Sequence, residues 1–249
     1  MILNGNKILI TGGCSGIGLA LARAFLNLDN TVIVCDYAKE KIEEVRKSDP
    51  RLHILYCDVT NPDDTSRLKK DIEKQFGGIN FLVNNAGSID RISFTTGDFD
   101  HRELEKHAKT NLVAPFALVK LFLPMLMAQK QPAIINIGSA LAYVPRPITP
   151  FYCATKAGVH SATKSLRVQL SETPVKVFEV LPPTVDTEMT KHSKVIKIST
   201  TQLAEAVVKG LLRNRAEIAV GYTPWLALAC RIAPKIMDKV AASKYWEKK

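Results

Sequence analysis

Several features that would place this chain in other protein classes are missing. Its 249 residues contain no low-complexity linker and no internal repeat, so one domain of ordinary α/β size is expected. The five cysteines are odd in number and lack metal-ligand spacing, which favours free thiols in a reducing cytoplasm and predicts no metal site. Residues 1–6 lack the long apolar core of a signal peptide, so secretion is not expected.

Signatures of nucleic-acid binding are also missing, although the chain is basic. Lys and Arg number 34 against 24 Asp and Glu, a formal net charge of +10. Such a balance is compatible with nucleic acid, anionic lipid or an acidic substrate as partner. The sequence has no basic stripe interleaved with aromatic residues, no zinc finger and no RNA-binding signature. A solvated basic surface is therefore favoured, and no nucleic-acid partner is expected.

A glycine-rich turn follows the first apolar segment. Lys7–Ile10 has the character of a strand buried on both faces, and a predicted helix begins near Leu19. Between them Gly12, Gly16 and Gly18 stand at the spacing Gly-x-x-x-Gly-x-Gly. A strand that turns on glycine into a helix presents unpaired N–H groups and a helix dipole, which favour phosphate. No Lys-Ser or Lys-Thr follows, which excludes an ATP-type phosphate loop. A glycine turn without a ligand is the alternative at this point.

The second predicted strand, Thr31–Cys35, is followed by Asp36. An acidic side chain about 20 residues after the glycine turn would accept hydrogen bonds from the ribose 2′-hydroxyl of NAD and repel the 2′-phosphate of NADP. The next residue, Tyr37, carries no positive charge, and Lys41 is expected on the following helix. NAD is therefore the expected cofactor and NADP the less favoured one. The alternative role for Asp36 is a helix cap.

Strands and helices alternate along the chain. Predicted strands at 52–57 and 81–83 flank a predicted helix at 62–76. This order predicts a Rossmann-like, doubly wound parallel sheet of about seven strands in a single α/β domain. Ligands of such sheets bind at the carboxyl ends of the strands. The polar or turn residues expected at those ends are Gly12, Asp36, Asp58 and Asn85.

A pair of residues suited to proton transfer stands in the second half of the chain. Tyr152 and Lys156 are four residues apart in a predicted helix and share one face. A free phenol has a pKa of about 10, and a neighbouring ammonium stabilises its phenolate. Tyr152 would exchange a proton with an alcohol or carbonyl oxygen, which Ser139 would hold by a hydrogen bond. An isolated Tyr-x-x-x-Lys is more often an exposed helix pair, but the upstream serine and the glycine turn favour catalysis.

Together these motifs resemble the short-chain dehydrogenase/reductase family. The match runs in order and spacing through Thr11–Gly18, Asp58–Val59, Asn84–Gly87, Asn111, Ser139 and Tyr152–Lys156. The chain further resembles the uncharacterised oxidoreductases named after the lipoteichoic-acid D-alanylation genes, a name that supplies no substrate. The resemblance implies an NAD(H)-dependent oxidoreductase that interconverts a secondary alcohol and a carbonyl, with Tyr152 as general acid/base. It also implies a homodimer or homotetramer.

The resemblance implies a role for each matched residue. Catalysis would fall to Asn111, Ser139, Tyr152 and Lys156, with Asn111 holding a water that connects Lys156 to solvent. Lys156 would also bind the nicotinamide ribose, and Thr187 the carboxamide. The expected cofactor contacts are Gly12, Cys14, Ser15, Gly16, Ile17, Gly18, Asp36, Asp58, Val59, Asn85, Ala86, Gly87, Tyr152, Lys156, Val185 and Thr187.

The long helical segment Phe99–Lys130 should be kinked. Pro115 has no N–H to bond the carbonyl of Asn111, so that carbonyl needs another donor, such as water. The apolar run Leu112–Ala128 contains one lysine and two prolines and is interpreted as a buried helix rather than a membrane span.

Other expectations concern thiols, the lid and the tail. Cys14, near a helix N-terminus, would be a reactive thiolate shielded by cofactor, or else a buried and inert residue. Pro182-Pro183 replaces the Pro-Gly usual in the family, which leaves the path of this loop open.

Residues from about 185 to 200 would form a substrate lid whose lysines are solvated or select an anionic substrate. The apolar tail, about 223–249, would pack on the body, cover the cleft or lie on an anionic membrane.

Two hypotheses from different classes follow. The first is the NAD(H)-dependent enzyme, and the second is an NAD-binding sensor or scaffold without activity, including a membrane-peripheral form. The intact set of Ser139, Tyr152 and Lys156 favours the enzyme, because a sensor needs no proton-transfer pair.

Overall fold

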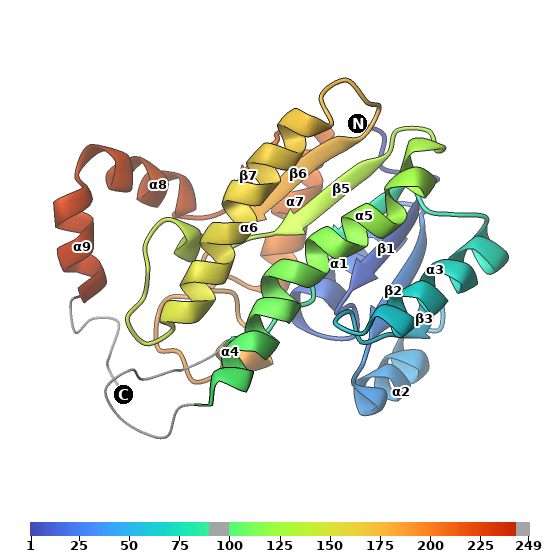
Figure 1. Cartoon of the computed structure of the whole chain (residues 1–249), viewed down its shortest axis with the longest axis horizontal. Coiled ribbons are helices and arrows are strands. Elements are labelled where there is room, and N and C mark those ends of the chain that lie inside the picture. The colour runs from blue at the N-terminus through green and yellow to red at the C-terminus, as the bar shows by residue number, and fades with distance from the viewer. Residues whose placement is uncertain (90–99, 243–249) are drawn as a thin grey trace.

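The computed structural model describes residues 1–89 and 100–242. Within them the strands form one parallel sheet of order β3-β2-β1-β4-β5-β6-β7 (Figure 1). The order runs outward in both directions from β1 and β4, so the direction of winding changes between these two central strands. This confirms the predicted doubly wound α/β fold. The strands are β1 (Lys7–Thr11), β2 (Thr31–Asp36), β3 (His53–Tyr56), β4 (Phe81–Asn84), β5 (Ala133–Ile137), β6 (Lys176–Leu181) and β7 (Glu217–Ala219).

Helices cover both faces of the sheet because successive strand residues point to opposite sides. Ile8 and Ile10 of β1 belong to a core shared with α1 (Gly16–Leu26), α2 (Lys39–Ser48) and α7 (Thr200–Leu212). Leu9 belongs to the opposite core. That core is shared with α3 (Pro62–Phe76), α5 (Ala114–Met127) and the C-terminal end of α6 (Pro150–Gln169). The fully apolar strands predicted from the sequence are therefore buried on both faces.

The predicted helix at 62–76 is confirmed as α3, and its end residues explain its bounds. The Asn61 side chain accepts a hydrogen bond from the backbone N–H of Asp63 at 2.9 Å, and Pro62 occupies the first turn. Gly77 ends the helix in a left-handed conformation with φ of 67°.

The predicted irregularity before Pro115 takes the form of a π-helical turn. A helix α4 (His101–Ala108) continues through the π-helix η1 (Lys109–Val113) into α5, and the backbone N–H of Ala114 bonds the carbonyl of Lys109. The wider turn adjusts the backbone where proline cannot donate a hydrogen bond. Phe99, where the segment was predicted to begin, lies outside the described residues.

The combined helical segment His101–Met127 is long and apolar enough to cross a membrane by length and composition, and 44% of its most apolar window is buried. Leu118, Phe122 and Leu126 are almost fully buried against the sheet. We therefore interpret α5 as a core helix of the α/β fold.

The C-terminal tail forms two helices, α8 (Thr223–Ile232) and α9 (Pro234–Ala242), which extend from the body beyond β7 (Figure 1). Its last predicted residues, 243–249, lie outside the described part of the chain. Two short 3-10 helices, η2 (Ala140–Ala142) and η3 (Glu188–Thr190), follow β5 and β6.

Candidate active site

A cavity of about 490 Å³ opens at the carboxyl ends of the strands. Its walls come from the loops after all seven strands of the described sheet, whose parallel order brings these loops to one edge. The predicted site residues that line it are Gly12, Ser15, Gly16, Ile17, Asp36, Asp58, Val59, Asn85, Ala86, Gly87, Ser139, Tyr152, Lys156, Val185 and Thr187. The three predicted residues that stand outside this set of described lining residues are Cys14, Gly18 and Asn111.

The glycine turn is tightly packed and suits a phosphate group. Gly12 has a φ of 62° and Gly16 a φ of 50°, both in the left-handed region. A Cβ at Gly18 would lie 2.2 Å from the carbonyl oxygen of Gly12, so Gly18 serves the packing of helix on strand. At the start of α1 the side chain of Ser15 makes no capping hydrogen bond, and the first turn has no acidic residue. The N–H groups at this helix end therefore remain available for an anion.

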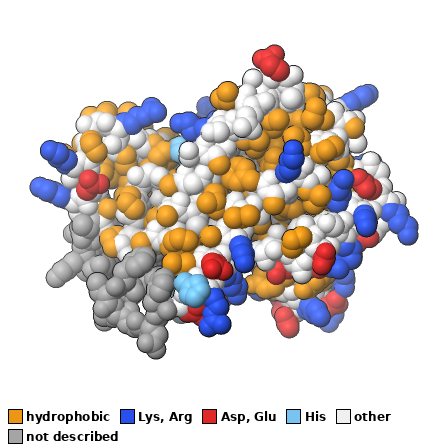
Figure 2. Space-filling model, viewed as in Figure 1, with side chains coloured by type: hydrophobic (Ala, Val, Ile, Leu, Met, Phe, Trp, Pro, Cys, Tyr) orange, Lys and Arg blue, Asp and Glu red, His pale blue; other side chains and the backbone are white. Residues whose placement is uncertain are grey.

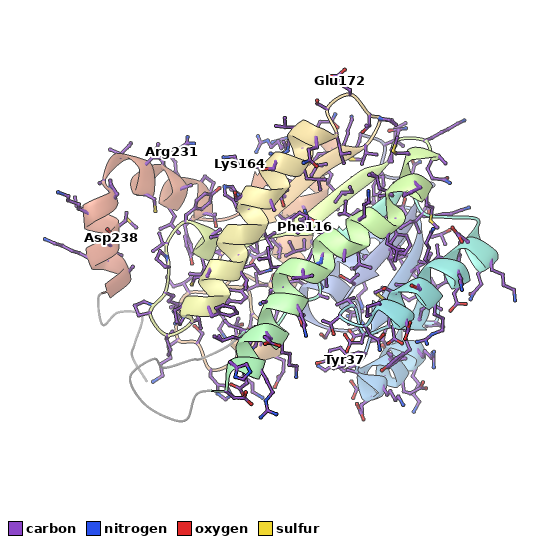
Figure 3. The ribbon with its side chains drawn as sticks, in the orientation of Figure 1. Tyr37, Phe116, Lys164, Glu172, Arg231 and Asp238 are labelled. Carbon is purple, nitrogen blue, oxygen red and sulfur yellow. The ribbon has the colours of Figure 1, made fainter. Side chains whose placement is uncertain are left out.

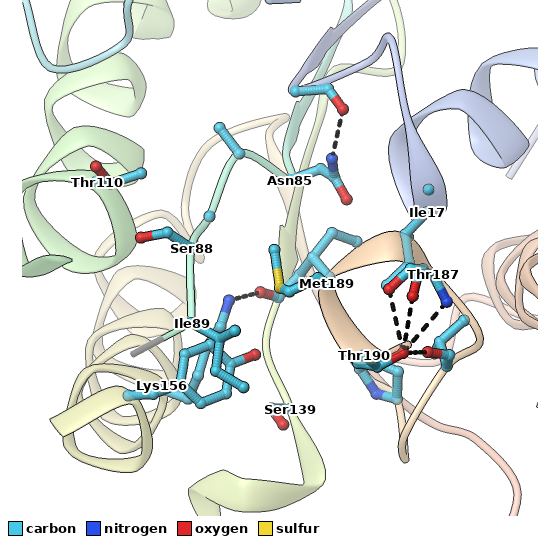
Figure 4. Close-up of a pocket in the computed structure, with 18 of the residues that line it drawn as sticks. Ile17, Asn85, Ser88, Ile89, Thr110, Ser139, Lys156, Thr187, Met189 and Thr190 are labelled. Atoms are coloured by element: carbon cyan, nitrogen blue, oxygen red, sulfur yellow. Dashed lines mark hydrogen bonds between the residues drawn. The ribbon is translucent and has the colours of Figure 1, made fainter. Parts of the chain in front are cut away.

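Asn85 ties the glycine turn to the next strand of the sheet. Its side-chain amide donates to the carbonyl oxygens of Thr11 at 2.9 Å and Gly12 at 3.0 Å. The hydroxyl of Thr11 in turn accepts from the backbone N–H groups of Asn85 and Ala86, each at 3.0 Å. Two segments that are far apart in sequence thus form one rigid wall of the cavity (Figure 4).

The carboxylate of Asp36 is fixed by the backbone. It accepts hydrogen bonds from the N–H groups of Cys14 at 3.2 Å and Ala38 at 3.1 Å. Lys41, near the start of α2, lines the same cavity together with Asp36. Lys41 lies on this helix as expected, but its presence in the lining means that the cavity is not without a basic side chain on α2.

Of the two alternatives predicted for Cys14, the structure supports the buried and inert residue over the reactive thiolate. Its side chain lies in the core behind the turn, and the residue is only 3% exposed. Burial, assisted by the negative charge of Asp36, raises the pKa of the Cys14 thiol to about 12. Desolvation outweighs the helix dipole here, so Cys14 behaves as a small buried apolar residue.

Lys156 and Tyr152 meet at the cavity as their helical spacing predicts. The ammonium of Lys156 lies 5.7 Å from the ring centroid of Tyr152 and donates to the carbonyl oxygen of Ile137 at 2.7 Å (Figure 4). Lys156 is 6% exposed, and burial lowers its pKa from 10.5 to about 8. A lysine in this state is still mainly charged at neutral pH and stands where it can stabilise a phenolate.

Ser139 ends β5 beside the same cavity. Its hydroxyl oxygen accepts from the N–H of Leu141 at 3.1 Å, which leaves its own O–H free to donate to a ligand. Asn111 stands behind the wall, where its side-chain amide pairs with both backbone groups of Ser88, at 2.8 and 2.9 Å. Its side chain thus shapes the Ser88 segment of the cavity, while the water-holding role of its carbonyl stays a prediction.

The segment after β6 is held by backbone pairing despite Pro183. Val185 and Ile198 form a parallel bridge, and the N–H of Asp186 donates to Ile198 at 2.9 Å. Lys191 pairs with Glu188 and Lys197 with Asp186, so these lysines have acidic partners on the segment itself. This arrangement favours the solvated alternative for these two lid lysines.

Two features of this region were missed in the sequence. The first is the apolar end of the cavity, which is lined by Leu141, Val144, Ile148, Met189 and Leu226. They come from η2, η3, the loop before α6, and α8, so no local sequence pattern predicts that they converge. Only the contribution of the tail, through Leu226, matches one of the predicted alternatives, in which the tail covers the cleft.

The second feature is a buried pair of His160 and Glu179 behind the cavity. Two signals were available: His160 follows Lys156 by one helical turn, and Glu179 interrupts an apolar strand. Together with Glu217 these residues bring ligand atoms within 4.8 Å of one another. The Arg167 guanidinium, 3.8 Å from Glu217, already supplies a positive charge there, and we assign no metal to them.

Comparison with known proteins places this geometry in a family. The model of the short chain dehydrogenase family matches residues 6–195. The chain is 37% identical to the "Uncharacterized oxidoreductase DltE" of Bacillus subtilis over 224 residues, 88% of this chain and 89% of that one. The chain belongs to the short-chain dehydrogenase family. Within the family it belongs to the DltE-like group. It is therefore an oxidoreductase.

The chain is also similar to another curated relative and to solved structures. The uncharacterized oxidoreductase MW2403 of Staphylococcus aureus is 30% identical over 84% of this chain and 92% of its own. A short chain dehydrogenase from Burkholderia cenocepacia, solved with NADP, is 25% identical and has a TM-score of 0.86 over 98% of this chain and 100% of that one. A Burkholderia phymatum enzyme solved with NAD is 18% identical and shares the fold, with a TM-score of 0.82 over 96% of each chain.

Proposed function

We propose that this protein interconverts a secondary alcohol and a carbonyl compound with NAD(H). The observation that supports this most is the buried Lys156 ammonium, 5.7 Å from the Tyr152 ring, in a cavity that Ser139 also lines. The glycine turn and the fixed Asp36 carboxylate suit a dinucleotide in the same cavity. Bound there, the nicotinamide cofactor supplies hydride to a carbonyl carbon or accepts it from an alcohol carbon.

The residues of this chain would handle the proton and the oxygen. Ser139 donates a hydrogen bond to the reacting oxygen and fixes its position. Tyr152 accepts the hydroxyl proton of the alcohol, or donates its own proton to the carbonyl oxygen in the reverse direction. Lys156 stabilises the phenolate form of Tyr152 through its charge.

The apolar end of the cavity suggests the substrate class. Leu141, Val144 and Ile148 precede Tyr152, and Leu226 of the tail closes the same side. An apolar lining favours a substrate whose carbon skeleton is hydrophobic, with one polar oxygen directed at Ser139 and Tyr152.

A substrate screen tests this function. Secondary alcohols of increasing chain length with NAD, and the matching ketones with NADH, would be followed by NADH absorbance. We expect turnover that rises with apolar chain length. Tight NADH binding without turnover of any alcohol or ketone would instead favour the sensor hypothesis.

The proposed preference for NAD rests on the balance between Asp36 and Lys41. Replacing Asp36 by Ala removes the repulsion of a 2′-phosphate, so we expect NADPH binding to tighten by about tenfold or more. Replacing Lys41 by Ala should shift the preference further toward NADH, because it removes a basic side chain of α2, the helix after Asp36, from the cavity lining. Fluorescence titration of both reduced cofactors with each variant measures this, and equal affinity of the unaltered protein for both would contradict it.

A second candidate function, docking on an anionic membrane, is favoured by the tail. Trp225 and Ile232 are each 74% exposed, and Ile236 is 63% exposed. Basic residues accompany them: Arg231 projects from α8 in Figure 3, and Figure 2 shows apolar and basic side chains side by side over α8 and α9. An exposed apolar helix face flanked by cations suits the boundary of an anionic bilayer. Leu226 joins this face to the cavity and would let an apolar substrate enter from the membrane.

Vesicle sedimentation of the full chain tests this docking. We expect binding to phosphatidylglycerol vesicles but little to phosphatidylcholine vesicles, and weaker binding at high salt. Trp225→Ser combined with Ile232→Ser should weaken binding at least about tenfold. Leu212→Ser, which alters an exposed leucine of α7, is the matched control. Equal binding of all variants, or a self-associated protein that binds no vesicles, would contradict membrane docking.

A further inference from the structure

A buried acid–base pair lies behind the cavity wall and has no part in the roles given above. Glu179 of β6 is fully buried, and its Oε2 lies 2.8 Å from Nδ1 of His160 in α6. Its other oxygen, Oε1, has no hydrogen-bond partner in the described structure. A buried carboxylate is costly unless it is paired or interacts with a charge. Such a half-satisfied group calls for an explanation.

Glu179 reaches the strand end that carries the catalytic residues because residue 138 is glycine. A Cβ at Gly138 would lie only 2.7 Å from Oε1 of Glu179. The carboxylate therefore packs against the backbone between Ile137 and Ser139. The carbonyl of Ile137 receives the hydrogen bond of Lys156, and Ser139 faces the cavity. The carboxylate of Glu179 thus lies behind both the Ile137 carbonyl, which binds Lys156, and Ser139.

The charged and titratable groups around Glu179 come from three elements. His160, Lys156 and Arg167 belong to α6, Glu217 to the neighbouring strand β7, and Tyr143 to the loop after η2. Burial raises the pKa of Glu179, and the contact with His160 acts against that rise. Burial also lowers the pKa of Lys156, and the negative charge of Glu179 acts against that fall. The negative charge of Glu179 therefore supports the charged form of Lys156, and His160 and Arg167 support the charged form of Glu179.

We propose that Glu179 is a positioning residue for Lys156: its carboxylate, held by His160, keeps the lysine charged from behind the strand while Tyr152 uses that charge in the cavity. The inference rests on the proposed function, because Glu179 acts on the reaction only through Lys156. It assigns a second, buried partner to Lys156, whose ammonium donates a hydrogen bond to the neutral carbonyl of Ile137.

Competitive acetylation tests this without a substrate. Acetic anhydride modifies only the neutral amine, so the labelling rate of Lys156 against pH, read by mass spectrometry of the full chain, reports its charge state. Glu179→Gln keeps the size and the hydrogen bond to His160 but removes the charge. We expect the labelling midpoint to move to lower pH by about one unit, with a rate at pH 7 about fivefold higher and an unchanged plateau at high pH.

The neighbouring carboxylate provides the matched control. Glu217 stands opposite Glu179 in the strand register and is partly exposed, so Glu217→Gln should change the Lys156 rate by less than about twofold. Should Glu179→Gln fail to fold, His160→Gln serves as the second variant, because loss of the imidazole favours the neutral form of Glu179 and moves the midpoint in the same direction. An unmoved midpoint in a folded variant overturns the proposal. A uniform rise in rate at every pH, which indicates loosened packing, overturns it as well.

A kinetic readout separates this inference from the proposed function. In Glu179→Gln the alkaline limb of kcat/KM should move to lower pH by about one unit, with NADH affinity retained. A shifted labelling midpoint in a protein that turns over no alcohol or ketone would leave the role of Glu179 standing and refute the reaction.

Discussion

Replacing Tyr152 by Phe should lower turnover by about a thousandfold while NADH affinity stays within about threefold of the unaltered protein. The phenyl ring of the variant still fills the cavity wall, so only the hydroxyl group that exchanges the proton is lost. Steady-state kinetics on the best substrate from the screen, together with NADH titration, measures both quantities.

Tyr222 provides the control for this substitution. It also lines the cavity but stands at its rim, next to α8, so Tyr222→Phe should leave kcat within about threefold. If Tyr152→Phe kept a tenth of the activity, the proton would have to pass through another group, and the assignment of Tyr152 would be refuted.

Replacing Lys156 by Met should abolish activity and yet stabilise the protein. The pKa of Lys156 falls from 10.5 to about 8 on folding because the ammonium is desolvated. The unfolded chain therefore binds more protons between these values, and the stability of the unaltered protein rises with pH from about 8 to about 10.5. Below about pH 8 the full cost of the buried charge is present. Allowing for the lost hydrogen bond to Ile137, we expect a gain of about 2 kcal/mol at pH 7.

Chemical denaturation of the cofactor-free protein at several pH values measures this effect. The difference between Lys156→Met and the unaltered protein should shrink as the pH approaches 10, because the native lysine is then neutral. Lys120→Met, at an exposed position of α5, should change the free energy of unfolding by less than about 0.5 kcal/mol at any pH. A stability gain that does not vary with pH would show that packing, and not desolvation, is responsible.

Local features of the sequence were sufficient to predict much of the fold and of the candidate site. Helix α3 could be predicted to its end residues because Asn61, Pro62 and Gly77 each satisfy a backbone requirement of a helix terminus. The positions of Tyr152 and Lys156 on one face follow from helical spacing alone. The alternation of strands and helices fixed which strand ends would meet, and Gly12, Asp36 and Asn85 do line one cavity.

Where burial competes with a local rule, the sequence left alternatives that only the structure decided. Cys14 stands near a helix N-terminus, which favours a thiolate, but its side chain turns into the core and its pKa rises to about 12. Lys41 lies on α2 as expected, and the first turn of that helix places it in the lining of the cavity that Asp36 also lines. In both cases the direction of a side chain decides the outcome, and this direction depends on how a helix packs.

The sequence by itself determined the order of the elements, the parallel sheet and the positions of the motifs proposed for catalysis and cofactor binding, because these depend on periodicity and on residues close in the chain. Only the tertiary structure decided which distant residues share an environment. It placed Glu179 of β6 behind Gly138 and beside His160, and it brought Leu226 of the tail to the apolar end of the cavity. Desolvation and charge coupling act through space, so the charge states of Lys156 and Glu179 are properties of the folded chain.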